Sequence, residues 1–273
     1  MLEAFDKGVN FFFFSSDLHH HFYSNMAPAL RSLCGKGASS REHVVLACVT
    51  YVTNPSLVEA ALLDQIGDLG LEYIDVFMWG MVPESTEVLA PLVRRASTLG
   101  GPSSDVMRFV ERLVGPSERL KRYGAIRHVG MSFHSAACAY EVSQTGAVDV
   151  LMIPHNVSHR GAQRILLQGL ARRPTRPGVV GFKSLVGTCG PLTARPRGVA
   201  PDVAVPTVAQ LYRYTLFQDN IDVCLTGPRT RADILVSLRA LQAGPLDRDE
   251  REYLERYGDV CAGRQPPATL APR

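Results

Sequence analysis

Short apolar runs alternate with amphipathic stretches along most of the chain. The runs are rich in Val, Ile, Phe and Tyr, which is typical of strands buried on both faces. They cover residues 9–14, 44–49, 73–79, 126–131, 148–153, 179–182 and 221–225. Between them, residues 55–69, 206–217 and 231–241 place apolar side chains at helical spacing. This alternation predicts parallel strands joined by right-handed helical crossovers.

The number and placement of the runs set the expected fold class. Seven strands are one fewer than a closed barrel of this class requires. The chain opens at a helix end, residues 2–7, so the first strand and most of its helix are missing from the pattern. A true start, a misassigned start codon and an open barrel remain as alternatives. We predict an α/β fold, a (β/α)8 barrel of TIM type over residues 1–262 that lacks, or is truncated at, its first strand, with a mobile tail at 263–273.

Composition narrows the class of protein. The chain has 273 residues, of which 46% are hydrophobic, enough for one large domain with a sizeable core. A net charge of +3 without a basic block argues against nucleic-acid binding. We also expect no membrane span, because no run of about 18 apolar residues occurs. Six scattered cysteines without a CxxC pair indicate a reducing, cytoplasmic environment.

Six segments resemble the aldo-keto reductase superfamily, in the order in which that family carries them. They are residues 7–12 (KGVNFF), 70–76 (GLEYIDV), 124–132 (GAIRHVGMS), 148–156 (VDVLMIPHN), 180–185 (VGFKSL) and 227–230 (GPRT). The resemblance implies a (β/α)8 barrel that binds NADP(H) across the carboxyl ends of its strands. It also implies an NADP(H)-dependent oxidoreductase acting on a small carbonyl compound or related metabolite.

The catalytic residues of that family have no match in this sequence. The family uses an Asp, a Tyr, a Lys and a His, with the Tyr as general acid. Ungapped matching places Phe13, Leu18, Val49 and Gly80 at these four positions. None of these side chains donates a proton or polarises a carbonyl, so the tetrad's reaction is not carried over. If the alignment shifts locally, Asp17, Tyr23 and Thr50 are groups that could take part.

The cofactor residues that the resemblance implies are half retained. Ser132 matches the family's nicotinamide-contacting Ser, whereas Phe133 and Met152 replace side-chain amides. The phosphate-binding end matches better, at Gly227, Arg229 and Thr230. There a helix N-terminus favours an anion and Arg229 can form a forked contact with a phosphate. NADP(H) is therefore the expected cofactor, in a weakened site; ordinary surface charge is the alternative interpretation of Arg229.

Polar residues follow several of the predicted strands, where the ligands of such barrels bind. Five of the eight histidines fall there: His19, His20, His21, His134 and His155. No metal motif occurs, so we predict no metal site. His134 and His155 follow strands directly, although either suits a hydrogen-bonded packing role. With Asp17 and Lys183 they form the predicted catalytic set.

Three hypotheses follow. The first is an aldo-keto-reductase-like enzyme with non-standard catalytic residues and a small-molecule substrate. The second is a repurposed non-redox enzyme whose His-rich rim performs acid/base or metal chemistry. The third is a non-catalytic binding or assembly protein, in which a partner or a second copy completes the missing first strand, because an exposed strand edge needs a cover.

Overall fold

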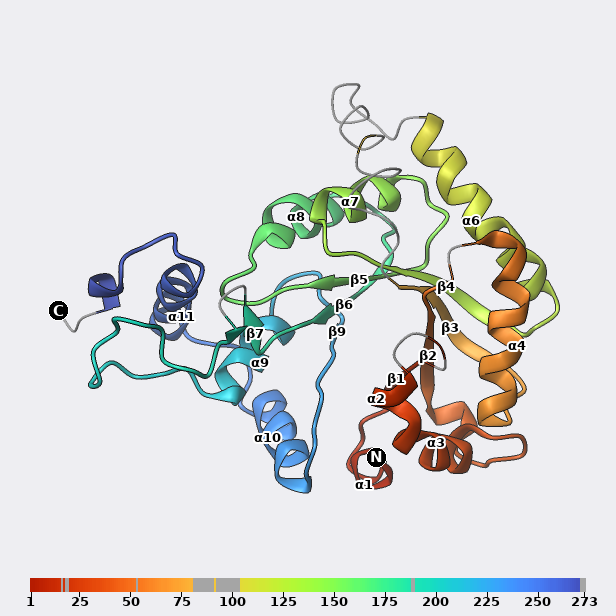
Figure 1. Ribbon diagram of the computed structural model, residues 1–273, viewed down its shortest axis with the longest axis horizontal. Helices are drawn as coiled ribbons and strands as arrows, with labels where there is room; N and C mark the ends of the chain where they lie inside the picture. Colours follow the sequence, from red (N-terminus) through yellow and green to blue (C-terminus); the bar gives the residue numbers. More distant parts are fainter. Residues whose placement is uncertain are drawn as a thin grey trace. The chain divides into compact units, whose positions relative to one another are not determined.

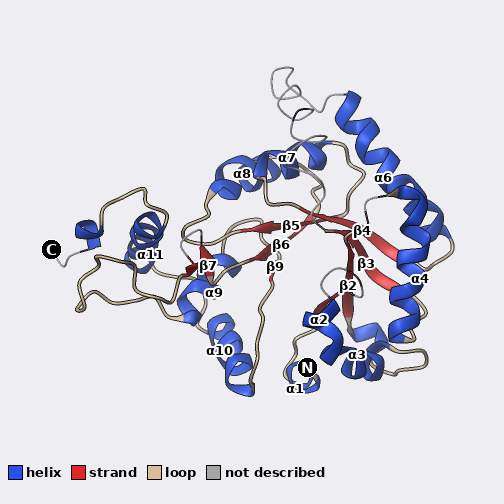
Figure 2. Cartoon of the chain, in the orientation of Figure 1, coloured by secondary structure: helices blue, strands red, loops and turns tan. Residues whose placement is uncertain are grey.

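The computed structural model describes residues 1–15, 17, 20–52, 54–80, 91, 104–187 and 190–270. The chain divides into two compact units, Met1–Leu151 and Met152–Arg273. Figure 1 shows the course of the chain and Figure 2 its helices and strands. Seven strands are hydrogen-bonded in the order β1-β2-β3-β4-β5-β6-β9. Among the described residues, no helix is long and apolar enough to cross a membrane.

The first unit is built on four parallel strands with helices between them. The strands are β1 (Phe11–Phe14), β2 (Val45–Thr50), β3 (Ile74–Trp79) and β4 (Ile126–Ser132). The helices are α1 (Leu2–Asp6), α2 (His20–Tyr23), α3 (Ala27–Cys34), α4 (Val58–Leu69), α6 (Ser104–Arg122) and α7 (Ala136–Gln144). Short 3-10 turns, η1 (Ser24–Met26), η2 (Arg41–His43) and η3 (Pro55–Leu57), join them. The register pairs Thr50 with Trp79.

Apolar sequence explains the strands of this unit, and one buried carboxylate fixes their amino ends. All six residues of β3 are buried, as expected for a strand covered on both faces. Asp75 accepts a hydrogen bond from the backbone N–H of Leu46 at 2.9 Å. It also forms ion pairs with Arg41 at 2.8 Å and Arg127 at 3.2 Å. Asp75 therefore ties β3 to its two neighbours.

The second unit contains the remaining strands. They are β5 (Val150–Pro154), whose first two residues belong to the first unit, β6 (Gly178–Phe182) and β9 (Val223–Cys224), with a small antiparallel pair, β7 (Val186–Gly187) and β8 (Gly190–Pro191). β6 and β9 run parallel. The helices are η4 (Gln163–Leu167), α8 (Gln168–Leu170), α9 (Val208–Leu216), α10 (Arg231–Gln242), α11 (Arg248–Cys261) and η5 (Pro267–Leu270).

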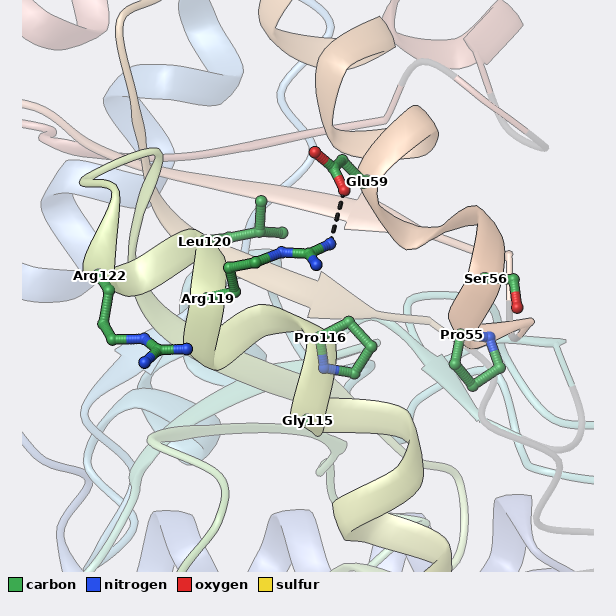
Figure 3. Close-up of a pocket in the computed structure, with 8 residues that line it drawn as sticks. All are labelled: Pro55, Ser56, Glu59, Gly115, Pro116, Arg119, Leu120 and Arg122. Atoms are coloured by element: carbon green, nitrogen blue, oxygen red, sulfur yellow. Dashed lines mark hydrogen bonds and ion pairs between the residues drawn. The ribbon is translucent and has the colours of Figure 1, made fainter.

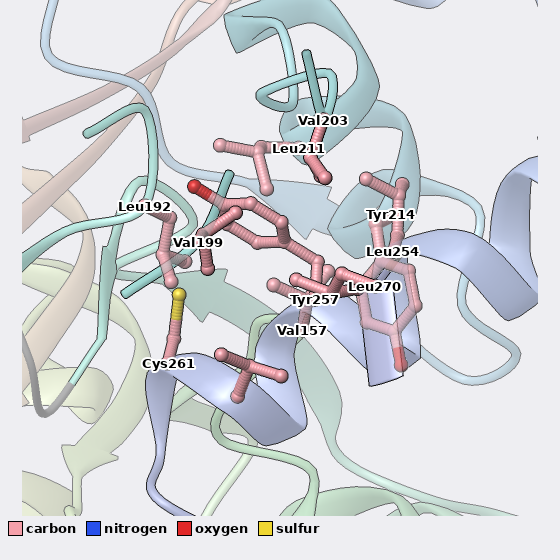
Figure 4. Close-up of a cluster of buried hydrophobic side chains, with 11 residues drawn as sticks. Val157, Leu192, Val199, Val203, Leu211, Tyr214, Leu254, Tyr257, Cys261 and Leu270 are labelled. Carbon is pink, nitrogen blue, oxygen red and sulfur yellow. The ribbon is translucent and has the colours of Figure 1, made fainter. Parts of the chain in front are cut away.

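A hydrophobic cluster of the second unit brings α9 and α11 together with irregular segments (Figure 4). Leu192, Val199 and Val203, from the Pro- and Gly-rich stretch before α9, are buried in it. Leu270, in the tail expected to be mobile, is also a member, at 6% exposure. The mobility of the rest of the tail stays a prediction.

Helix α11 makes one contact that requires glycine. A Cβ atom added at Gly258 would lie 2.1 Å from the carbonyl oxygen of Val157. The backbone of the helix therefore packs directly on the segment that follows β5. Glycine is the residue that permits this approach.

The predicted elements are confirmed, with small differences at their ends. Each of the seven predicted strands is present, as β1 to β6 and β9, and the three named helices appear as η3 with α4, α9 and α10. α10 begins at a capping box, in which Thr230 and Asp233 bond reciprocally to each other's backbone N–H groups. The helix was predicted at 231–241 from apolar spacing alone, and the capping box explains why it begins there.

Candidate functional site

The positions matched to the family's catalytic residues lie at the carboxyl ends of the first strands. Phe13 and Val49 are buried, at 6% and 1% exposure. Gly80 follows β3 and donates its N–H to the carbonyl of Thr50 at 2.7 Å. Leu18 falls outside the described residues. Phe13, Val49 and Gly80 supply no ionisable group to this end of the sheet.

A carboxylate joins the loop after β1 to the end of β2. One oxygen of Asp17 accepts the Ser15 hydroxyl at 2.9 Å. The other accepts the Thr50 hydroxyl and the backbone N–H of Tyr51, both at 2.8 Å. We call Ser15, Asp17, Thr50 and Tyr51 the Asp17 cluster. Its carboxylate fixes the geometry of the strand end, because each hydrogen bond to a charged acceptor is stronger than a neutral one.

Tyr51 lies directly over the place where a side chain at position 80 would project. A Cβ atom on Gly80 would come within 2.5 Å of the ring carbon Cε1 of Tyr51 and 2.7 Å of a methyl of Val49. Burial raises the pKa of Tyr51 to about 12, and the nearby Tyr23 and Asp17 act in the same direction. The phenol is therefore neutral at physiological pH and serves as a hydrogen-bond donor or acceptor.

Tyr23 stands beside this cluster from the loop side. Its ring packs edge-on against Phe13 and Phe14, with centroid distances of 5.8 and 6.2 Å. Burial raises its pKa as well. The structure thus brings together Asp17, Tyr23 and Thr50. These are the three residues that a locally shifted alignment would offer as catalytic groups. Tyr51 was not among the predicted site residues, although it directly follows β2, at the strand end where ligands of such barrels bind.

The end of β4 contributes little polar surface. Ser132 is 8% exposed and Phe133 is 1% exposed. His134 follows on the surface, and Ser135 then caps α7 by accepting the backbone N–H of Cys138 at 3.2 Å. The apolar, buried Phe133 leaves no amide here to bind a nicotinamide carboxamide.

His155 occupies a packing position. It is fully buried, and its ring stacks on Tyr214 with a centroid distance of 5.6 Å and an interplanar angle of 16°. Neither ring nitrogen has a hydrogen-bond partner among the described residues. Burial lowers its pKa to about 4, assisted by the charges of Arg251 and Arg160. A neutral imidazole enclosed in this way packs well but has no described group with which to exchange a proton.

Asn156 organises the carboxyl ends of β5 and β6. Its amide nitrogen donates to the carbonyls of Lys183 at 2.8 Å and Val186 at 3.0 Å. Its amide oxygen accepts the backbone N–H groups of Ser158 at 2.9 Å and His159 at 2.8 Å. The buried side chain therefore holds the backbones of His159 and Lys183 next to each other.

Lys183 has an unusual backbone conformation for a lysine. Its φ is +58°, in the left-handed region. Such a conformation costs a side-chain-bearing residue about 1–3 kcal/mol and persists when its surroundings enforce it. Here the hydrogen bond from Asn156 supplies part of that constraint. The Lys183 side chain is exposed, with its ammonium 5.7 Å from the Phe182 ring centroid.

Positive charge gathers around this feature. Burial lowers the pKa of His159, and the charges of Lys183 and Arg264 lower it further. Arg264 donates to the carbonyl of Ser158 at 3.0 Å and to Asp259 at 2.7 Å. Asp259 also forms an ion pair with Arg160, which has a second carboxylate partner in Glu255 at 3.4 Å. We call His159, Lys183 and Arg264 the cationic triad, in which Lys183 and Arg264 carry the positive charge and His159, with its lowered pKa, is neutral at physiological pH. The two cations suit an anion.

The predicted phosphate-binding residues lie at the start of α10. Gly227, Arg229 and Thr230 are exposed. The carboxylate of Asp233 accepts the backbone N–H groups of Arg229 at 3.0 Å and Thr230 at 2.9 Å. These hydrogen bonds hold the pKa of Asp233 below its usual value. A phosphate bound at this helix start would therefore be repelled by the carboxylate of Asp233, which already accepts these N–H groups.

Within the described part of the chain, the other rim histidines and one surface cavity add no residue to the candidate site. His19 falls outside the described residues, as does the side chain of His20. No group of three or more His, Cys, Asp or Glu residues in the described part of the chain is arranged to bind a metal. A cavity of about 470 Å³ lies between η3, α4 and α6, and an ion pair of Arg119 with Glu59 crosses it at 2.7 Å (Figure 3). None of the predicted site residues lines this cavity.

Comparison with known proteins identifies the fold. No protein-family profile matches the sequence, and no curated protein matches it either. The apo form of the aldo-keto reductase AKR11C1 from Bacillus halodurans is 18% identical, with a TM-score of 0.63 over 94% of this chain and 84% of its own. The holo form is 17% identical, with a TM-score of 0.63 over 94% of this chain and 84% of its own. A thermostable aldo-keto reductase, Tm1743, in complex with the inhibitor epalrestat, is 15% identical, with a TM-score of 0.65 over 93% of this chain and 84% of its own.

At these identities the similarity shows the fold alone. The chain has the (β/α)8 TIM-type fold in which solved aldo-keto reductases are built, which confirms the predicted fold class. Residue roles do not transfer with a fold. Any activity therefore depends on this chain's own polar groups, which gather in the Asp17 cluster, the cationic triad and the start of α10.

Proposed function

We propose that this protein is an NADP(H)-dependent oxidoreductase that acts on a small carbonyl compound without the Asp, Tyr, Lys and His tetrad. The observation that carries the proposal is Lys183, held in a left-handed conformation by Asn156 beside His159. Strain of this kind concentrates at ligand-binding sites. In this fold, ligands bind at the carboxyl ends of the strands, where Lys183 and His159 lie.

The residues present fit one part of the cofactor better than the other. The cationic triad and Arg229 offer cationic groups suited to phosphate oxygens. At the nicotinamide end, Ser132 remains, while Phe133 and Met152 are apolar and buried. The bound cofactor would supply the hydride, and the chain's own residues would bind the phosphates and orient the carbonyl. This division predicts binding dominated by phosphate contacts, and therefore sensitive to salt.

Titration of the purified protein with NADPH, followed by calorimetry, tests the proposal. We expect micromolar affinity that weakens as ionic strength rises. Lys183→Gln should weaken binding roughly tenfold or more, because a charge-assisted contact is lost. Arg248→Gln is the matched control, since it removes a charge from the same unit at a side chain that is 88% exposed. No binding at millimolar NADPH would rule out the oxidoreductase.

A second candidate, a binding protein without turnover, is favoured by the buried apolar residues at the tetrad positions. Phe13 and Val49 leave no proton donor of the usual kind. Retained NADPH affinity with no oxidation of NADPH across a panel of aldehydes and ketones would identify this candidate. The panel should include aromatic and aliphatic carbonyls, because the identity of the substrate does not follow from the fold.

A further inference from the structure

We infer that the cavity between η3, α4 and α6 binds a small organic monocarboxylate, held by Arg119 and Arg122 of α6. The inference does not rest on the proposed function, because the cavity shares no residue with the Asp17 cluster, the cationic triad or the start of α10. All of its lining residues belong to the first unit.

The walls of the cavity suit a ligand with a polar end and an apolar body. The volume, about 470 Å³, falls within the range of small-molecule sites. Three side chains offer apolar surface: Pro55 of η3, and Pro116 and Leu120 of α6 (Figure 3). The polar groups of the lining are the Ser56 hydroxyl, the Glu59 carboxylate and the two guanidinium groups. A few charged groups set among apolar side chains can orient a ligand as well as hold it.

The charge of the lining indicates the class of ligand. Arg119 and Arg122 bring two positive charges and Glu59 brings one negative charge, so the lining carries a net charge of +1. A single carboxylate on the ligand would therefore make the site neutral. A guanidinium group presents N–H donors in a fork that matches a carboxylate, and hydrogen bonds between charged partners are stronger than neutral ones.

A carboxylate of the protein already binds in this place. One oxygen of Glu59 accepts a hydrogen bond from Nη2 of Arg119 at 2.7 Å. Both side chains are about half exposed, at 55% and 53%, and an ion pair as exposed as this contributes little to stability. The carboxylate of a ligand can therefore replace Glu59, or share Arg119 with it, at little cost to the fold.

Two residues of α6 that line the cavity are poorly suited to a helix. Pro116 lies inside the helix and has no N–H, so the carbonyl of Arg112 loses its usual helical donor. Gly115 precedes it, and glycine is the next least favoured residue in a helix interior. Internal packing does not require this glycine, because a Cβ atom there would meet nothing within 4 Å. Departures from local preference that the fold does not need are expected at functional sites.

Gly115 leaves space at the wall of the cavity that a ligand can use. A larger side chain would extend into volume that no described residue occupies, next to the apolar surface of Pro116. The same change would favour the helix. Ligand affinity and stability should therefore move in opposite directions on substitution of Gly115, as is common where a binding site is kept at some cost to folding.

Titration with 3-phenylpropionate, followed by calorimetry and by ¹⁵N NMR, tests the inference. We expect a Kd on the order of 1 mM, as for other ligands of this size, with the largest amide shifts at Ser56, Gly115 and Arg119. The neutral 3-phenylpropionamide should bind at least about tenfold more weakly, because it lacks the charge. Inorganic phosphate should also bind more weakly, because it has no apolar body.

Charge variants separate this site from general electrostatic attraction. Arg119→Gln should weaken binding of 3-phenylpropionate at least about tenfold. Arg108→Gln is the matched control, on the same helix but outside the cavity and with a side chain that is 78% exposed, and should change the Kd less than about twofold. Glu59→Gln should tighten binding about two- to fivefold, because it removes the competing carboxylate.

Shape variants test the cavity itself. Gly115→Leu should weaken binding at least about fivefold and raise the midpoint of urea unfolding. Gly67→Leu, in α4, is the matched control, because its added Cβ also meets nothing within 4 Å and Gly67 does not line the cavity. It should raise the midpoint and leave the Kd unchanged.

The outcomes decide the inference without reference to NADPH, which enters none of these titrations. Binding that Arg119→Gln and Gly115→Leu both weaken, with both controls unchanged, supports it. An absence of amide shifts at about ten times the expected Kd overturns it, as does binding that survives Arg119→Gln. Equal losses in Arg108→Gln and Arg119→Gln would indicate general electrostatic attraction and also overturn it. Phosphate that binds as tightly as 3-phenylpropionate would overturn the organic acid as the ligand.

Discussion

The ring of Tyr51 fills the space next to Gly80 that a side chain at position 80 would need. A Cβ atom on Gly80 would lie only 2.5 Å from the ring carbon Cε1 of Tyr51. The two residues are neighbours in register, since Thr50 pairs with Trp79 at the ends of β2 and β3. Their identities are therefore coupled, and a change at one has consequences that depend on the other.

Gly80→Ala should destabilise the protein. The added methyl group must displace a half-buried ring and a buried valine, and overpacking of this kind costs about 1–3 kcal/mol. Urea unfolding should show a lower midpoint, and the loss should shrink in a Tyr51→Ala background. Gly67→Ala in α4 is the control, because nothing lies within 4 Å of its added Cβ and a helix prefers alanine. Equal losses in both backgrounds would contradict the coupling.

His155→Phe should keep or raise stability at neutral pH. Both ring nitrogens are buried without a partner in the described residues, so the imidazole retains a desolvation cost that a phenyl ring stacked on Tyr214 does not have. Thermal unfolding at pH 7 measures the change. Turnover measured on the same variant tests the predicted catalytic role of His155, which requires the activity to disappear.

The same variant should remove an acid-sensitive contribution to stability. The folded pKa of His155 is about 4 and its ordinary value is 6.5. Between these values the unfolded chain binds more protons than the folded one, so the free energy of unfolding falls as pH falls through this window. The full effect is about 3 kcal/mol. Unfolding curves from pH 7 to pH 4 should therefore be flatter for His155→Phe, and parallel curves would argue against a neutral buried imidazole.

Asp233→Asn should tighten phosphate binding at the start of α10. The change removes a negative charge that occupies the helix N-terminus, while an amide oxygen can still accept the N–H groups of Arg229 and Thr230. We expect NADPH affinity to rise about two- to fivefold. Asp247→Asn, the equivalent N-cap change on α11, is the control. Unchanged affinity in Asp233→Asn would indicate that the phosphate binds elsewhere.

Asp259→Asn should destabilise the second unit. Burial opposes ionisation of this carboxyl, but hydrogen bonds from Arg264 and Arg160 outweigh it and hold its pKa low. Its loss leaves Arg264 without this carboxylate and Arg160 with Glu255 alone, at 3.4 Å, and should cost about 1–3 kcal/mol. Glu252→Gln, which breaks an exposed pair with Arg248, should leave the free energy of unfolding almost unchanged. Because the folded pKa is depressed, the contribution of Asp259 is present at neutral pH and disappears as pH falls through that pKa.

The fold could be predicted from the sequence because its strands are short, apolar and separated by amphipathic helices. The run at 73–79 became β3, and the apolar spacing at 231–241 became α10. The ends of β6 were harder to interpret. Nothing in the sequence around Lys183 indicates a left-handed lysine, since that conformation depends on Asn156, which is distant in the chain.

The candidate site was predictable in part, because the predicted strands show where their carboxyl ends lie. Strand ends identify which residues can meet, so Asp17 and Thr50 were found. Side-chain partners decide what those residues do. His155 followed a strand, as a catalytic histidine would, yet tertiary packing enclosed its ring against Tyr214. Tyr51 was overlooked because its significance depends on the empty space at Gly80, which becomes visible only when β2 and β3 are paired.

The direct contact between Gly258 and the backbone of Val157 has a thermodynamic consequence for ligands. Because main chain rests on main chain there, the segment from Val157 to His159 has little freedom to rearrange. An anion that binds to the cationic triad would meet a surface already in its bound form, and would lose little of its binding free energy to ordering the protein. Small entropic penalties and fast association are the expected signature of such a rigid receptor, even where the affinity itself is modest.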